Sequence, residues 1–156
     1  MDKTHLHKII AWTLVLVWMG VIFYLSHQAG GASSELSSGL VDIVYRILSG
    51  LLPFISIDVD LLHFTVRKFA HFTAYFILGV FILHALVVNR EITVKILLAS
   101  FLFTVVYAIS DEVHQLFIPG RSGEVRDVLI DSSGSLLGIC LYAMMRRLIL
   151  RWKGRL

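Results

Sequence analysis

Acidic side chains stand beside long apolar segments in this chain. Asp111 and Glu112 follow one apolar run, and Asp127 and Asp131 lie at the start of the next. Carboxylates can serve as general acids or bases, as partners of cations or as metal ligands. A charge at the centre of a membrane-spanning helix costs about 2.5–3.5 kcal/mol, so acids in such segments indicate a functional site.

The composition predicts an integral membrane protein with a single domain over residues 1–156. Apolar residues make up 57% of the chain and charged residues only 16%, whereas a soluble domain carries about 25% charged residues. The single cysteine, Cys140, excludes a disulfide framework and a CxxC-type metal site. The net charge of +3 lies mainly near the ends of the chain, which suits membrane topology better than nucleic-acid binding.

Four apolar segments predict four transmembrane helices, at about residues 9–25, 69–88, 94–110 and 128–145. Residues 36–52 place apolar side chains at helical spacing with polar ones between them, which predicts an amphipathic helix on the membrane surface. The fold class is therefore all-α, polytopic, with an interfacial helix between the first and second spans. A cleaved signal peptide is the alternative for the first segment, but that segment is longer than the usual core of about 7–15 residues.

The distribution of Lys and Arg predicts the orientation in the cell membrane. The N-terminus, the turn around Arg90 and Lys95, and the C-terminal tail hold nine of the fourteen Lys and Arg residues. Basic loops stay in the cytoplasm, so both termini are expected there. The two acid-rich connections, before residue 69 and around residue 120, are then expected to face outward.

Helix geometry predicts that the polar residues share one layer of the membrane. A rise of ~1.5 Å per residue places Asp111 ~24 Å above Lys95 and His71 ~28 Å above Arg90, and Asp131 reaches a similar height. We therefore expect a charged cavity that opens outward. Its predicted members are Lys68, His71, Tyr75, Asp111, Glu112, Gln115, Arg121, Asp127 and Asp131.

Ion pairs that merely hold four short helices together would account for the same pattern. Three further interpretations assign it a function: binding of an anionic group by the basic residues, catalysis, or proton-coupled transport, for which four spans give little room. Catalysis would use His71 or Glu112 as general base with Asp111 as its partner, although no GxSxG-type nucleophile motif is present. A metal-dependent version would use Asp111, Glu112, His114 and Asp131, but their spacing matches no standard ligand set, so we predict no metal and no cofactor.

An ordered series of motifs resembles the VanZ-like family. The series is Lys68-x-x-His71-Phe72-x-x-Tyr75-x-x-x-Gly79, then Asp111-Glu112-x-x-Gln115-x-Phe117-x-Pro119-Gly120-Arg121, then Asp127 and Gly134. Ser26-x-Gln28 after the first span also resembles the family pattern, and the resemblance covers roughly residues 9–145. At one position the chain departs from it, because Asp131 stands where the family usually has Asn.

The resemblance implies a bacterial cell-envelope protein of a family named for a member linked to teicoplanin resistance. Our preferred expectation is an outward-facing cavity that binds a lipid head group, a lipid-linked wall precursor or a lipoglycopeptide, and so lowers glycopeptide susceptibility. The alternative is a membrane-embedded enzyme that acts on a lipid or wall precursor through His71, Asp111 and Glu112. Self-association or another membrane protein is a further partner left open, and nucleic acid is not expected.

Overall fold

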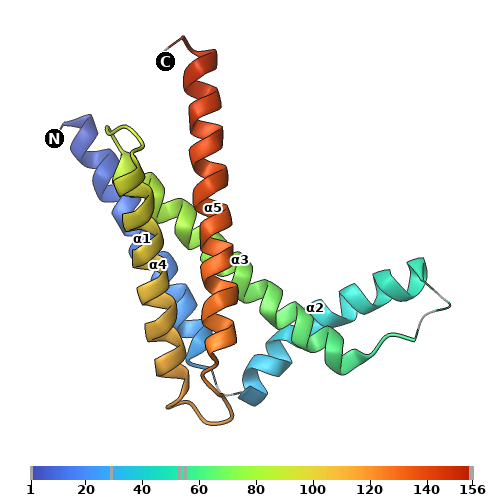
Figure 1. The fold of residues 1–156 in the computed structure, drawn as a ribbon. Helices are drawn as coiled ribbons and strands as arrows, with labels where there is room; N and C mark the ends of the chain where they lie inside the picture. The colour runs from blue at the N-terminus through green and yellow to red at the C-terminus, as the bar shows by residue number, and fades with distance from the viewer. Residues whose placement is uncertain (1, 29, 53, 55, 155–156) are drawn as a thin grey trace.

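The computed structural model describes residues 2–28, 30–52, 54 and 56–154, and within these ranges the chain is helical with no strand. Five helices follow one another along the chain (Figure 1). They are α1 (Lys3–Ser26), α2 (Gly30–Leu51), α3 (Val59–Val87), α4 (Val94–Gln115) and α5 (Val125–Trp152). The predicted all-α fold class is confirmed.

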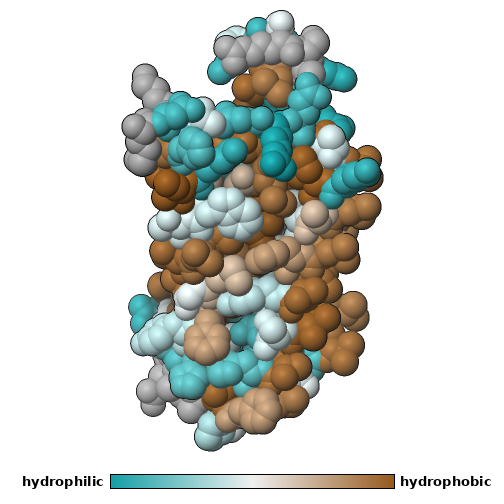
Figure 2. Space-filling view, turned by 90° about the vertical axis from the view of Figure 1, so that its left-hand side faces the viewer, coloured by the Kyte–Doolittle hydropathy of each residue, from teal (hydrophilic) through white to brown (hydrophobic). Residues whose placement is uncertain are grey.

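Four of these helices, α1, α3, α4 and α5, are long and apolar enough to cross a membrane. Large apolar side chains on their outer surfaces are exposed, such as Leu16 at 65% and Val106 at 65%. An exposed apolar surface of this extent is compatible with lipid and not with water. Figure 2 shows hydrophobic side chains between two hydrophilic regions on the face it draws.

Both termini lie at the same end of the structure, together with the α3–α4 connection (Figure 1). The α4–α5 connection lies at the opposite end, beside the end of α1 and the start of α2. At that end α2 and the first half of α3 extend away from the other helices as an arm. This arrangement puts the basic segments at one end and the acid-rich segments at the other, as the sequence predicts.

The interfacial helix and the four spans are confirmed, and α1, α4 and α5 extend beyond the predicted spans. Helix α2 starts at Gly30, six residues before the predicted start at residue 36, because its glycines and serines continue the helix rather than forming a turn. Helix α3 starts at Val59, where the Asp58 side chain accepts hydrogen bonds from the N–H groups of Asp60 and Leu61. Helices α4 and α5 extend past the apolar segments to Gln115 and Trp152. The added residues Asp111, Glu112 and Gln115 of α4 are buried, whereas the last turn of α5 is largely exposed.

Helix α3 packs against α5 more extensively than any other pair of helices. The two helices run in the same direction (Figure 1) and come close because glycines line the contact. A Cβ atom added at Gly134 would lie 2.2 Å from the carbonyl oxygen of Phe72, and one at Gly138 would lie 2.3 Å from that of Phe76. Gly134 and Gly138 thus form a small-xxx-small face, which allows helices to approach closely in membranes.

Polar contacts fix the other helices against this pair. The Trp18 indole of α1 donates a hydrogen bond of 2.9 Å to the Ala74 carbonyl of α3. The Tyr107 hydroxyl of α4 donates one of 2.7 Å to the Met19 carbonyl of α1. Without these bonds, the partly buried indole N–H and hydroxyl groups would lack a hydrogen-bond partner in lipid.

We predict that Gly134→Ala lowers the stability of the folded protein by about 1–3 kcal/mol, the usual cost of overpacking. The added methyl group meets backbone atoms of α3, so the helices must move apart. Denaturant titration in mild detergent, followed by circular dichroism, measures the change.

The matched control is Gly20→Ala on α1, where nothing lies within 4 Å of the added Cβ. There the substitution is expected to be neutral or to stabilise by up to about 1 kcal/mol, because alanine is the better helix former. Equal effects of the two substitutions would contradict the close α3–α5 contact.

Candidate functional site

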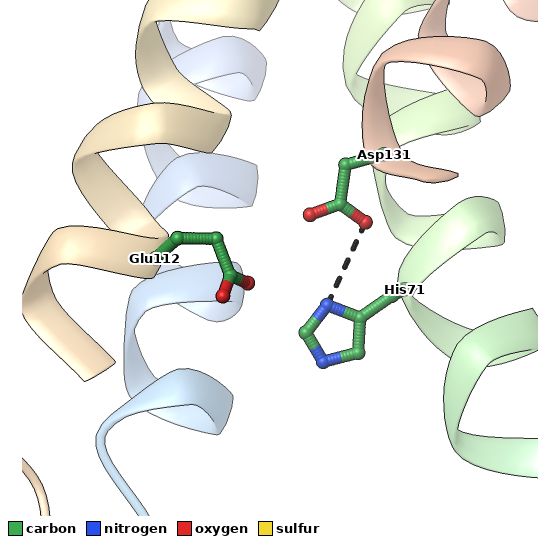
Figure 3. Close-up of side chains that lie close together, drawn as sticks. All are labelled: His71, Glu112 and Asp131. Atoms are coloured by element: carbon green, nitrogen blue, oxygen red, sulfur yellow. Dashed lines mark ion pairs between the residues drawn. The ribbon is translucent and has the colours of Figure 1, made fainter. Parts of the chain in front are cut away.

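The polar residues of α3, α4 and α5 meet at the end of the structure opposite the termini. Lys68 and His71 of α3 face Asp127 and Asp131 of α5 as two successive charge pairs. The two residues on α3 are three positions apart and the two on α5 are four apart, so each helix presents both of its residues on one face. Glu112 of α4 completes the cluster from the third side (Figure 3).

The outer pair joins the Lys68 ammonium to the Asp127 carboxylate in a close hydrogen-bonded contact. The two side chains are only 13% and 9% exposed. Lys68 also lies 3.8 Å from a Glu124 carboxylate oxygen and 5.1 Å from the centre of the Phe64 ring. The positive charge of Lys68 is thus balanced by carboxylates of the protein itself.

The inner pair is looser and more deeply buried. His71 Nδ1 lies 3.6 Å from Asp131 Oδ1, which is too long for a hydrogen bond. Asp131 is 0% exposed, and neither of its carboxylate oxygens has a hydrogen-bond partner among the described residues. A buried carboxylate in this state destabilises the folded protein, because it has lost its hydration without gaining a hydrogen-bond donor.

Asp111 joins α4 to α1. Its Oδ2 atom accepts a hydrogen bond of 2.8 Å from the Ser26 hydroxyl at the end of α1. Its Oδ1 atom and the hydroxyl of the fully buried Tyr75 have no such partner among the described residues. Both atoms are buried, and the two groups are close enough to interact with each other.

Glu112 is held in place by the α4–α5 connection. Its Oε1 atom accepts from the Gln115 side-chain amide at 3.0 Å, and its Oε2 atom accepts from the Glu124 backbone N–H at 2.9 Å. A glycine at position 120 allows the turn between these contacts, since its φ of 75° lies in the left-handed region.

The Arg121 side chain caps the C-terminal end of α1 with hydrogen bonds. Its guanidinium donates to the carbonyl oxygens of Gln28 at 2.8 Å and Leu25 at 3.0 Å, which have no partner inside the helix. Burial lowers the pKa of Arg121, and the nearby Arg67 guanidinium lowers it further. Arg121 therefore has a structural role, and it shares its surroundings with a second cation.

A groove of about 270 Å³ opens between α1, α2 and α3 beside this cluster. Its apolar part includes Ile22, Leu25, Leu40 and Val66. Its polar part consists of Ser26, Gln28, Arg67, His71, Tyr75 and Arg121. The groove therefore combines apolar side chains with basic and hydrogen-bonding ones.

All nine residues predicted for the cavity lie at this end of the structure, as parts of the charge pairs, of the α4–α5 connection or of the groove. Of the four residues considered as metal ligands, Glu112 and Asp131 lie in one group of possible ligand atoms. Asp111 accepts from Ser26 instead, and His114 lies outside the group. Its ring lies against His27, with Nε2 3.1 Å from Nδ1 of that residue. His71 takes its place beside Glu112 and Asp131.

Ser26 and Leu40 were not among the predicted site residues. Ser26 could have been chosen, because the Ser-x-Gln pattern follows the first span at the height of the acids. Leu40 gave no signal of its own, because its place in the groove depends on how α2 folds back beside α3.

We predict that Lys68→Met and Asp127→Asn each lower the free energy of unfolding by about 3 kcal/mol, because each leaves a buried charge unpaired. The double substitution should cost less than the sum, with a coupling above about 1 kcal/mol. Denaturant titration of the four proteins gives the coupling energy.

Asp42 and Arg46 provide the matched control, since both are exposed on α2 four residues apart. Their coupling should stay below about 0.5 kcal/mol. Strictly additive effects at Lys68 and Asp127 would show that the two side chains do not form a pair.

The chain was also compared with known proteins. Neither the curated proteins nor the solved structures gave a match. A family model described as VanZ/LLP1 matches residues 11–146, which include α3 and α4, most of α1 and α5, and every residue of the charged cluster. The chain is thus a multi-pass membrane protein that belongs to the VanZ/LLP1 family.

Proposed function

We propose that this protein binds the anionic head group of a membrane amphiphile in the groove between α1, α2 and α3, from the outer leaflet of the cell membrane. The ligand classes are a lipid head group, a lipid-linked wall precursor or a lipoglycopeptide. They share a negatively charged head and a hydrocarbon tail.

The observation that carries the proposal is the lining of the groove, which combines apolar side chains with basic ones. Leu25, Leu40 and Val66 offer a surface for the first part of a hydrocarbon chain. Arg67, His71 and Arg121 offer donors and positive charge for phosphate or carboxylate, for which guanidinium groups are well suited. A mainly apolar pocket with a small number of polar groups that point into it is typical of ligand sites.

The charges near the groove favour an anion. The Arg67 and Arg121 guanidiniums oppose each other electrostatically, which is one cause of the lowered pKa of Arg121. An anion between them would relieve that repulsion. The unpartnered Tyr75 hydroxyl, which also lines the groove, supplies a further donor.

Helix α2 provides access from the bilayer. Its apolar side chains are largely exposed, for instance Leu40 and Ile43 at 57% each, as expected of a helix that lies in the membrane interface. An amphiphile that diffuses in the outer leaflet would meet this helix at the edge of the groove. Binding of a wall precursor or of the drug itself there would lower susceptibility to teicoplanin-type glycopeptides.

A second function, hydrolysis or transfer on the bound amphiphile, is favoured by the position of His71. This imidazole has Asp131 on one side and Glu112 nearby, which is a suitable setting for a general base. In that case His71→Ala would abolish turnover of the amphiphile even at concentrations that saturate the groove, while the protein still folds.

Native mass spectrometry of the protein in mild detergent tests the binding proposal. We expect the wild type to retain an anionic lipid or precursor. Arg67→Ala should reduce occupancy about tenfold or more through loss of a charged hydrogen bond, and Leu40→Trp should do so by filling the apolar part of the groove.

Arg46→Ala and Leu129→Trp are the matched controls, since both residues are exposed and neither lines the groove. Their occupancy should equal that of the wild type. Equal occupancy in all five proteins, or an empty wild type, would contradict the proposal.

A further inference from the structure

We propose that His71, Glu112 and Asp131 form a binding site for one divalent transition-metal cation, with Mn²⁺ and Zn²⁺ as the fitting ions. The three side chains come from α3, α4 and α5 (Figure 3). Each offers one ligand atom, and these atoms all lie within 4.8 Å of one another.

The spacing of the ligand atoms is close to that of a metal site. Bonds of about 2.0–2.2 Å to a shared ion put ligand atoms about 3–4 Å apart. The most widely separated ligand atoms therefore need to approach by about 1–2 Å, which rotation of the His71 ring and of the Glu112 side chain can supply. In Figure 3 the three groups point toward a common space between the helices.

The state of Asp131 points independently to a cation. This carboxylate is 0% exposed and has no hydrogen-bond donor among the described residues, although it points at His71 and Glu112. Asp111 Oδ1 lacks a donor as well. Buried carboxylates are normally compensated by donors, by cations or by metal ions, and a bound ion would compensate Asp131 directly.

Lys68 and Arg121, two basic residues nearby, have other partners. Lys68 pairs with Asp127 and Glu124, and Arg121 donates to backbone carbonyls and to Gln115. Three buried acids, at positions 111, 112 and 131, thus face the imidazole of His71. A divalent ion bound to two of them would bring this part of the protein close to neutrality.

The surroundings hold the ligands as metal sites require. Glu112 is fixed by donors from Gln115 and from the Glu124 backbone, and each of its oxygens keeps a lone pair for an ion. Outer hydrogen bonds of this kind orient ligands and tune affinity. One imidazole with two carboxylates suits Mn²⁺ or Zn²⁺, whereas Mg²⁺ and Ca²⁺ prefer oxygen donors alone.

The ion would lie beside the proposed amphiphile groove, because His71 lines both. A cation there would attract the phosphate or carboxylate of the ligand. This extension rests on the proposed function, whereas metal binding itself does not.

Metal binding can be measured directly on the full chain. The protein, purified through a tag without histidine, is stripped with EDTA and titrated with Mn²⁺, and the free ion is followed by electron paramagnetic resonance. We expect one Mn²⁺ per chain, displaced by Zn²⁺, and a rise in melting temperature on binding.

Asp131→Asn should weaken Mn²⁺ binding by at least about tenfold, since even loss of an outer partner has that effect. It should fold, because a neutral amide is cheaper to bury than a carboxylate. His71→Gln should behave in the same way. His84→Gln and Asp42→Asn, which lie outside the cluster, should bind Mn²⁺ like the wild type.

Absence of stoichiometric Mn²⁺ and Zn²⁺ binding in the wild type would overturn the proposal, as would unchanged affinity in Asp131→Asn. The Arg67→Ala variant separates this inference from the proposed function. If it loses the amphiphile but keeps the metal, both proposals hold, and if the wild type binds metal but no amphiphile, only the groove proposal fails.

Discussion

The close approach of α3 and α5 is the constraint on which the rest of the structure depends. Gly134 and Gly138 allow the backbone of α5 to contact the carbonyl groups of Phe72 and Phe76. In lipid there is no hydrophobic force to bring helices together, so small residues and polar contacts must do so. Because the helices are parallel and in register, the same contact sets Lys68 against Asp127 and His71 against Asp131.

The remaining elements complete a polar site at one end of this pair. Helix α4 adds Glu112 and Asp111, α1 adds Ser26, and the connection after α4 returns Arg121 to the end of α1. Most of the charges are satisfied within the protein. The polar groups without a partner among the described residues belong to Asp131, Asp111 and Tyr75. Tyr75 lines the groove, and Asp131 belongs to the proposed metal site.

Much of this could be predicted from the sequence, because membrane spans follow from hydropathy and the depth of each charge follows from helical rise. The layer of acids at positions 111, 127 and 131 is an example. The partner of each basic side chain could not be predicted, because it depends on side-chain packing. Arg121 and Lys68 looked alike in sequence as ligands for an anion, yet Arg121 caps α1 and lines the groove, whereas Lys68 pairs with Asp127 and does not line it. The replacement of His114 by His71 near Glu112 likewise depends on helix rotation.

The central claim is that the polar site and its groove face the outside of the cell. Ser122, exposed in the α4–α5 connection, can be changed to cysteine in a Cys140→Ser background and treated in intact cells with a membrane-impermeant maleimide. The account predicts labelling of Ser122→Cys in intact cells, and labelling of Lys153→Cys near the C-terminus only after permeabilisation. The reverse pattern would place the site in the cytoplasm and contradict the account.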